Sequence, residues 1–121
     1  MLDIKDIYES RKKIRELYDH DTKYGDLVGA LLGIREKNKC IESMDVRIQG
    51  EYKIAVDLAE NTTDAQAQDV NNQIFSCLVS YVEQNIDKVG VSKQLFEKTI
   101  DSCPSEMIDS ILVGNSLCIM L

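Results

Sequence analysis

The sequence contains few of the residues from which catalytic and metal sites are built. It has one histidine, one proline and no tryptophan. Its four cysteines form no Cys-x-x-Cys pair and stand at positions 40, 77, 103 and 118. Motifs such as His-x-x-x-His, Gly-x-Ser-x-Gly and a glycine-rich phosphate loop, which mark common metal, hydrolase and nucleotide sites, are absent from it. The sequence therefore predicts no catalytic residue, no metal site, no cofactor and no enzyme.

The single histidine, His20, stands between Asp19 and Asp21. A histidine near physiological pH can act as a general base, but only beside a nucleophile and an orienting group. Neither is indicated by the surrounding sequence. We interpret His20 as a hydrated turn residue.

Long apolar runs are also missing. The sequence holds no stretch of about 18 apolar residues, which a membrane-spanning helix would need. Residues 1–6 alternate charged with apolar side chains and lack the apolar centre of a secretion signal. We therefore expect a cytoplasmic protein with reduced cysteines. A chain of 121 residues that is 44% hydrophobic suits one globular domain over 1–121.

Basic residues are scarce in the second part of the sequence. Residues 1–48 hold ten Lys/Arg and ten Asp/Glu, whereas residues 49–121 hold four and eleven, which accounts for the formal net charge of −7. Phosphate binding depends on clustered Lys and Arg, so we do not expect nucleic acid as a partner. A partner protein with a basic surface fits this charge, and so does simple solubility.

Two runs of alternating polarity predict an antiparallel β-hairpin. They cover residues 43–48 and 51–58, and Gly50 between them supplies the positive φ of a tight turn. The apolar positions are Met44, Val46 and Ile48 in the first run and Ile54, Val56 and Leu58 in the second. The apolar segment Leu117–Leu121 is expected to be buried, either as a third strand beside the hairpin or in a subunit interface.

A long helix is predicted over residues 64–88. Thr63 and Gln66 form a capping-box pattern at its start, and Gly90 is placed to end it. Its apolar stripe consists of Val70, Ile74, Cys77, Leu78, Tyr81, Val82 and Ile86. Such a helix can cover the apolar face of the hairpin.

Shorter helices are predicted over 3–19, 26–37, 93–102 and 104–113. The first has an apolar stripe of Ile4, Ile7, Tyr8, Ile14, Leu17 and Tyr18. Gly29 and Gly33 weaken the second helix, which leaves strand as an alternative for residues 27–37. On a helix these glycines share a face and allow another backbone to approach closely. The expected fold class is α+β, with a small antiparallel sheet packed against a long central helix and three or four shorter ones.

The early polar face of the long helix is rich in amides where charges are more usual. Amides donate and accept hydrogen bonds without the desolvation cost of an ion, so this face is suited to a contact surface. A merely solvated face remains the alternative. The predicted partner-binding residues are Gln68, Asn71, Asn72, Glu83 and Asp87.

Two functions are compatible with these features. The first is a small acidic protein-interaction module, an inhibitor or adaptor that occludes a basic partner surface, in the manner of small acidic inhibitors of phages and mobile elements. The second is a homo-oligomeric protein that binds a small ligand, with subunits joined through Leu117–Leu121 or through the Gly29/Gly33 face. An enzyme without a recognisable motif is a third and less favoured alternative.

Overall fold

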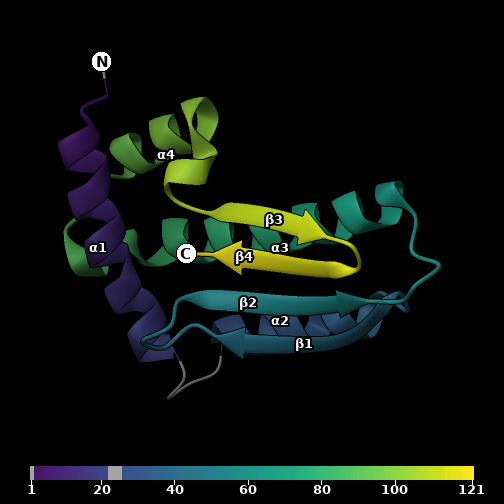
Figure 1. Cartoon of the computed structure of the whole chain (residues 1–121). Helices are drawn as coiled ribbons and strands as arrows, with labels where there is room; N and C mark the ends of the chain where they lie inside the picture. Colours follow the sequence, from purple (N-terminus) through teal and green to yellow (C-terminus); the bar gives the residue numbers. More distant parts are fainter. Residues whose placement is uncertain (1, 22–25) are drawn as a thin grey trace.

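The computed structural model describes residues 2–21 and 26–121, except for the side chain of Asp21 (Figure 1). The described helices are α1 (Ile4–Asp21), α2 (Asp26–Lys37), α3 (Asp64–Asn85) and α4 (Lys93–Ser102). The described strands are β1 (Ile41–Arg47), β2 (Lys53–Leu58), β3 (Asp109–Val113) and β4 (Ser116–Met120). Two short 3-10 helices, η1 (Ile86–Val89) and η2 (Pro104–Glu106), follow α3 and α4.

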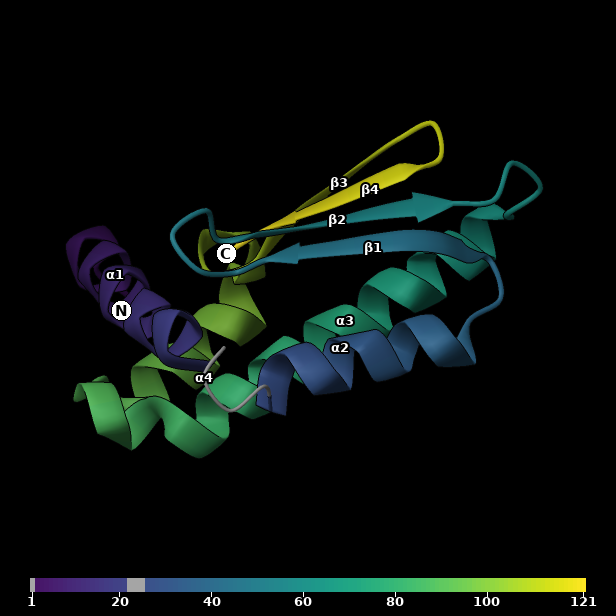
Figure 2. The same cartoon turned by 90° about the horizontal axis from the view of Figure 1, so that it is seen from below.

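The four strands form one antiparallel sheet in the order β1-β2-β4-β3. Helices α2 and α3 lie against one face of this sheet, and Figure 2 shows no described helix over the other face. Helices α1 and α4 pack together at the end of the sheet where the β1–β2 turn lies (Figures 1 and 2). The predicted α+β fold is confirmed. None of the helices among the described residues is both long and apolar enough to span a membrane.

The predicted hairpin is confirmed as β1 and β2, with Met44 opposite Val56. Its turn is longer than the expected two residues, because the last paired residues are Arg47 and Lys53. Gly50 adopts φ 71°, as expected, and Tyr52 adopts the less common φ of 54°. The apolar residues of β2 are buried between the sheet and the helices, which is the cover that the hairpin requires.

The C-terminal segment enters the sheet as β4, between β2 and β3. The expected third strand beside the hairpin is therefore confirmed. Leu117, Ile119 and Leu121 are buried in the fold of this chain, whereas Cys118 and Met120 lie on the open face of the sheet.

The predicted helix over residues 104–113 is wrong. Only the short η2 forms after Pro104, and Asp109–Val113 is the strand β3. The run Ile111-Leu112-Val113 is apolar and rich in β-branched residues, so it fits a pleated strand, and β4 provides its partner. Gly114, with φ 60°, opens the two-residue turn between β3 and β4 instead of ending a helix.

The capping prediction for α3 is confirmed, and α4 also has a side-chain cap. Thr63 and Gln66 form both hydrogen bonds of a capping box, and Ser92 accepts a hydrogen bond from the Leu95 N–H. The helical stretch that begins with α3 ends at Gly90, which has the left-handed φ of 68°.

Two details of the shorter helices differ from the prediction. Ile4 and Tyr8 are expected on the buried face of α1 but are 78% and 72% exposed. The buried face includes Ser10, and its centre lies about 100° around the helix axis from Ile4 and Tyr8. Residues 26–37 form a helix, which removes the strand alternative. A side chain placed at Gly29 or Gly33 would meet nothing within 4 Å. The expected close backbone approach is therefore wrong within this chain.

Candidate functional site

The five predicted partner-binding residues lie on α3 and η1, but they do not form one surface. Gln68 and Asn72 are exposed and joined by a 2.9 Å hydrogen bond, and Asn71 is half-buried beside them. Glu83 and Asp87 lie at least 11 residues further along the chain, which is about 16 Å on a helix. The structure thus brings three of the five residues together.

Several of the amides on α3 have partners within the chain. Gln66 is used in the capping box. Gln73 exchanges hydrogen bonds of 2.9 and 3.2 Å with Asn38, and it also donates to Asp69. These contacts fasten the end of α2 to α3. Gln68 and Asn72 bond to each other, so what this face offers a partner is the amide of Asn71 and the remaining hydrogen-bonding groups of Gln68 and Asn72.

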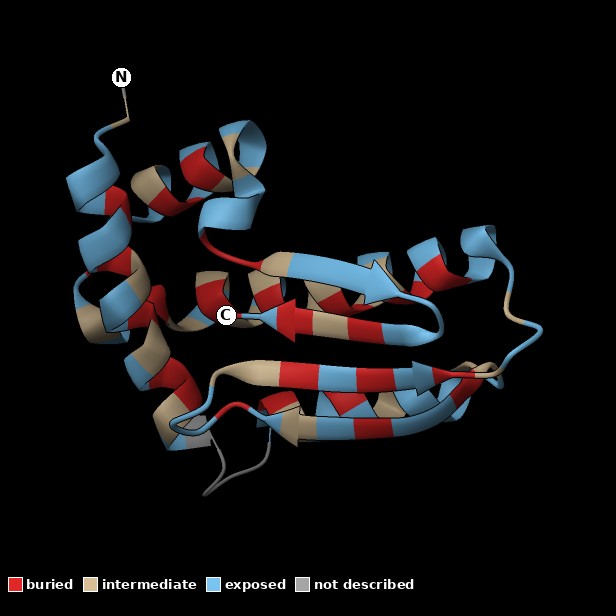
Figure 3. Cartoon of the chain, viewed as in Figure 1, coloured by how far each residue is buried: buried red, intermediate tan, exposed pale blue. Residues whose placement is uncertain are grey.

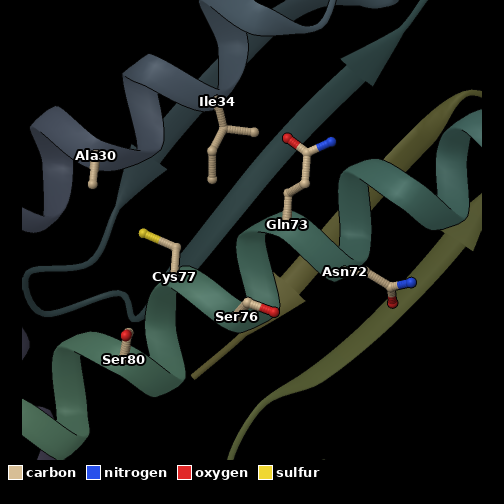
Figure 4. Close-up of a pocket in the computed structure, with 7 residues that line it drawn as sticks. All are labelled: Ala30, Ile34, Asn72, Gln73, Ser76, Cys77 and Ser80. Atoms are coloured by element: carbon tan, nitrogen blue, oxygen red, sulfur yellow. The ribbon is translucent and has the colours of Figure 1, made fainter.

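A shallow groove runs between α2 and α3, and we call it the α2–α3 groove. Its lining residues, shown as sticks in Figure 4, are Ala30, Ile34, Asn72, Gln73, Ser76, Cys77 and Ser80. Ala30 and Ile34 come from α2, and the remaining five come from α3. Four of these seven residues have neutral polar side chains, most of the exposed lining area is apolar, and no side chain is charged. This groove offers neutral hydrogen-bonding groups but no charge that would orient a ligand.

A second groove of about 260 Å³ lies between the first half of α3 and the strand β3, and we call it the α3–β3 groove. It is lined by Asp64, Ala67, Gln68, Asn71, Ser110, Leu112 and Leu117. It combines an apolar floor with two of the predicted amides and one carboxylate. Leu112 remains 43% exposed there, although its side chain is on the face of the sheet that the helices cover.

Strand β3 borders this groove and forms one edge of the sheet. All of its residues after Asp109 are exposed, and the strand is correspondingly pale blue in Figure 3. On the open face of the sheet Ile111 and Val113 are 53% and 67% exposed. An exposed apolar edge strand is unusual, because proteins normally protect such edges against pairing with other chains.

The hydrogen-bond pattern determines which main-chain groups of β3 point outward. The N–H of Leu58 donates to the carbonyl of Asn115, and the N–H of Leu121 donates to the carbonyl of Tyr52, each at 2.8 Å. In an antiparallel sheet, successive residues of a central strand direct their main-chain N–H and carbonyl groups alternately to the strand on one side and to the strand on the other. Cys118 and its neighbours two residues away therefore bond to β3, where Cys118 is opposite Ile111.

It follows that Ser110 and Leu112 direct their main-chain groups away from the sheet. The Ser110 N–H is 3.0 Å from the Asp109 carboxylate and donates to it. The N–H and carbonyl of Leu112 and the carbonyl of Ser110 are oriented toward the open edge of β3. No strand of the described part of the chain lies beyond that edge.

Sequence reasoning missed this edge because residues 104–113 were assigned to a helix. A signal was present, since three apolar residues rich in β-branching precede Gly114-Asn115, a dipeptide typical of hairpin turns. That turn indicates a hairpin formed by the segments on either side of it, which are β3 and β4.

A separate cluster fastens the β1–β2 turn to α1. The Asp19 carboxylate accepts hydrogen bonds from the Tyr52 hydroxyl at 2.9 Å and from the Gly50 N–H at 3.1 Å. The hydrogen bond from the Tyr52 hydroxyl to Asp19 raises the pKa of Tyr52 above its ordinary value, and burial raises it further by a smaller amount. The Arg15 guanidinium lies 4.5 Å from the centre of the Tyr52 ring and donates to the main-chain oxygen of Leu121. These contacts position structural elements, and we assign them no chemistry.

A pocket of about 240 Å³ lies beside His20. It is lined by Glu16, Leu17, His20, Asp26, Tyr81, Asn85, Lys88 and Val89. His20 itself is exposed in the last turn of α1 rather than in a loop. The Tyr81 hydroxyl donates to the Leu17 carbonyl at 3.1 Å. Among the residues that the structure describes, no group of three His, Cys, Asp or Glu side chains is arranged to hold a metal ion.

All four cysteines are half-buried, and none of them forms a disulfide. Cys40, Cys77 and Cys103 pack against the hydrophobic core. Such packing is typical of a free cysteine that acts as a small apolar residue.

No family model, no curated protein and no solved structure matches this chain.

Proposed function

We propose that the protein is an acidic protein-interaction module that binds a basic surface of another protein and thereby occludes it, acting as an inhibitor or adaptor and not as an enzyme. The binding surface in this proposal is the α3–β3 groove together with the open edge of β3. The observation that carries it is an apolar edge strand next to a groove that presents a carboxylate and amides.

The distribution of charge supports a basic partner. Residues 54–87 contain six Asp and Glu and no Lys, Arg or His, and residues 99–121 contain three acids and no base. These two segments supply all of β3, β4 and α3. Every lining residue of the α3–β3 groove therefore comes from a part of the chain without cations, and a basic partner would be attracted to it.

The alternative of a homo-oligomeric ligand-binding protein has weaker support. Leu117, Ile119 and Leu121 are buried within the chain's own fold, which leaves only Cys118 and Met120 of that segment at the surface. The side chains that line the α2–α3 groove are all neutral, so the groove offers no charged group to orient a small ligand (Figure 4).

The proposal is tested with two matched charge reversals. Asp64 is the first residue of α3, and Asp26 is the first residue of α2. Both changes to lysine alter the net charge equally and place a cation at the positive end of a helix dipole. A partner is first captured from a lysate on immobilised wild-type protein and identified by mass spectrometry, and its affinity is then measured for each variant by calorimetry.

We expect Asp64→Lys to weaken binding about tenfold or more, which is about 1.4 kcal/mol, and Asp26→Lys to leave the affinity nearly unchanged. Wild-type affinity should also fall as the salt concentration rises. An affinity that is insensitive to salt, or equal losses in the two variants, would contradict the proposal.

A further inference from the structure

We infer that β3 binds an extended segment of the partner by strand addition, and that this segment alternates β-branched with basic side chains. The inference rests on the proposed function, because it specifies the partner segment and the way in which it binds to the same surface. In strand addition, main-chain hydrogen bonds provide affinity, and alternate side chains provide specificity.

The two edges of the sheet differ in how well they are protected. The edge strand β1 has an irregular register between Ile41 and Ser43 and carries Asp45 and Arg47 on the open face. Irregular pairing and charged side chains are the usual means of preventing an edge from pairing. Strand β3 has a regular register and presents Ile111 and Val113 on that same face. An added strand is therefore expected at β3.

The side chains of the added strand are specified by the two faces of β3. Residues that are directly opposite each other in a sheet point to the same face. Side chains opposite Ile111 and Val113 would lie on the open face, where β-branched residues pack well. Side chains opposite Ser110 and Leu112 would instead enter the α3–β3 groove.

The groove favours a long basic side chain at these inward positions. The aliphatic stem of a lysine or arginine can cover Leu112, while its charged end reaches the polar wall that α3 provides. That wall consists of Asp64, Gln68 and Asn71. All three are acceptors of hydrogen bonds, and Asp64 supplies the negative charge.

A second copy of this chain is a poorer occupant of the same edge. Pairing two copies of β3 about a two-fold axis would bring together two surfaces whose β3, β4 and α3 segments contain no Lys, Arg or His, each with Asp64 in the groove beside the contact. Like charges across an interface lower the affinity. Charge complementarity therefore selects a basic segment.

The experiment uses the full chain and a defined probe, a fluorescein-labelled seven-residue peptide that alternates valine with lysine. Fluorescence anisotropy at low ionic strength measures its affinity, and a peptide that alternates valine with glutamate is the control. We expect the lysine peptide to bind at least about tenfold more tightly than the glutamate peptide.

A matched pair of variants then isolates the main-chain contact. Leu112→Pro removes the outward N–H of β3, at a position where an edge strand tolerates proline. Leu112→Ala removes most of the same side chain but keeps the N–H. We expect about a tenfold loss of affinity for Leu112→Pro and a loss of only about two- to threefold for Leu112→Ala.

If Leu112→Pro does not fold, N-methylation of alternate amides in the lysine peptide tests the same contact with wild-type protein, and methylation on one edge of the peptide should abolish binding. If Leu112→Pro and Leu112→Ala bind the lysine peptide with equal affinity, or if N-methylation of the peptide does not weaken its binding, strand addition is overturned. A wild-type dimer that dissociates in Leu112→Pro would also overturn it, because a second copy would then occupy the edge. If the peptide does not bind but the captured partner still distinguishes Asp64→Lys from Asp26→Lys, the inference fails and the proposed function stands.

Discussion

At the scale of single residues, the buried tyrosine Tyr18 has the clearest physical consequence. It is 2% exposed and stacks on Tyr81 with ring centres 6.3 Å apart. Burial, and secondarily the neighbouring Tyr81, raise the pKa of Tyr18 well above its ordinary value of 10.0. The folded state therefore holds the phenolic proton more tightly than the unfolded state does.

This difference predicts a loss of stability at alkaline pH. The contribution of Tyr18 is fully present below pH 10 and is lost as the pH rises from there toward the raised pKa, at up to about 1.4 kcal/mol per pH unit. Tyr18→Phe should therefore lose about 1.4 kcal/mol less stability than wild type between pH 8 and pH 11. Urea unfolding at the two pH values measures this, with the exposed Tyr8→Phe as the control. If the free energy of unfolding changes with pH identically in wild type and Tyr18→Phe, the ionisation of Tyr18 is not coupled to folding.

Most individual assignments that depended on local sequence are confirmed. The capping box at Thr63 and the left-handed Gly90 each depend on residues within a few positions of one another. The contact between Asp19 and Tyr52 could not be predicted in this way. It joins positions 33 residues apart, and nothing in either local sequence indicates the other.

At the scale of secondary-structure elements, periodicity predicted the long helix and the hairpin but not β3. Helix α3 is 22 residues long and repeats its buried apolar positions from Ala67 to Val82, so its period is unambiguous. Strand β3 has five residues, and a short apolar run fits a helix and a strand equally well. Its pairing with β4 decides between them, and that pairing is tertiary information. The candidate site at β3 cannot be predicted from the periodicity of the sequence for the same reason.

The importance of α3 for the core gives a prediction about stability. Ile74 is fully buried in the middle of this helix. Ile74→Asp would bury a carboxylate without a partner, so we expect a loss of at least about 4 kcal/mol, enough to unfold much of the population. Circular dichroism during thermal unfolding measures the effect. Ser80→Asp adds the same charge at an exposed position of α3, and the two variants should not melt alike.

At the scale of the whole molecule, two properties coincide at one place. The sheet leaves β3 at an exposed edge, and the segments that form β3, β4 and α3 contain no Lys, Arg or His. The net charge of −7 alone would indicate only solubility. The acidic residues lie beside an apolar edge strand and a groove, and this location is what supports recognition of a basic segment.

The most direct test of this account is a map of amide chemical shifts in the ¹⁵N-labelled chain of residues 1–121, titrated with the valine–lysine peptide. We predict that the largest changes occur at the main-chain amides of Ser110–Val113 and at the side-chain amides of Gln68 and Asn71. The amides of α1 and of the α2–α3 groove should change little. Changes concentrated at the α2–α3 groove, or none at β3 when the peptide is bound, would contradict the assignment of this edge as the binding surface.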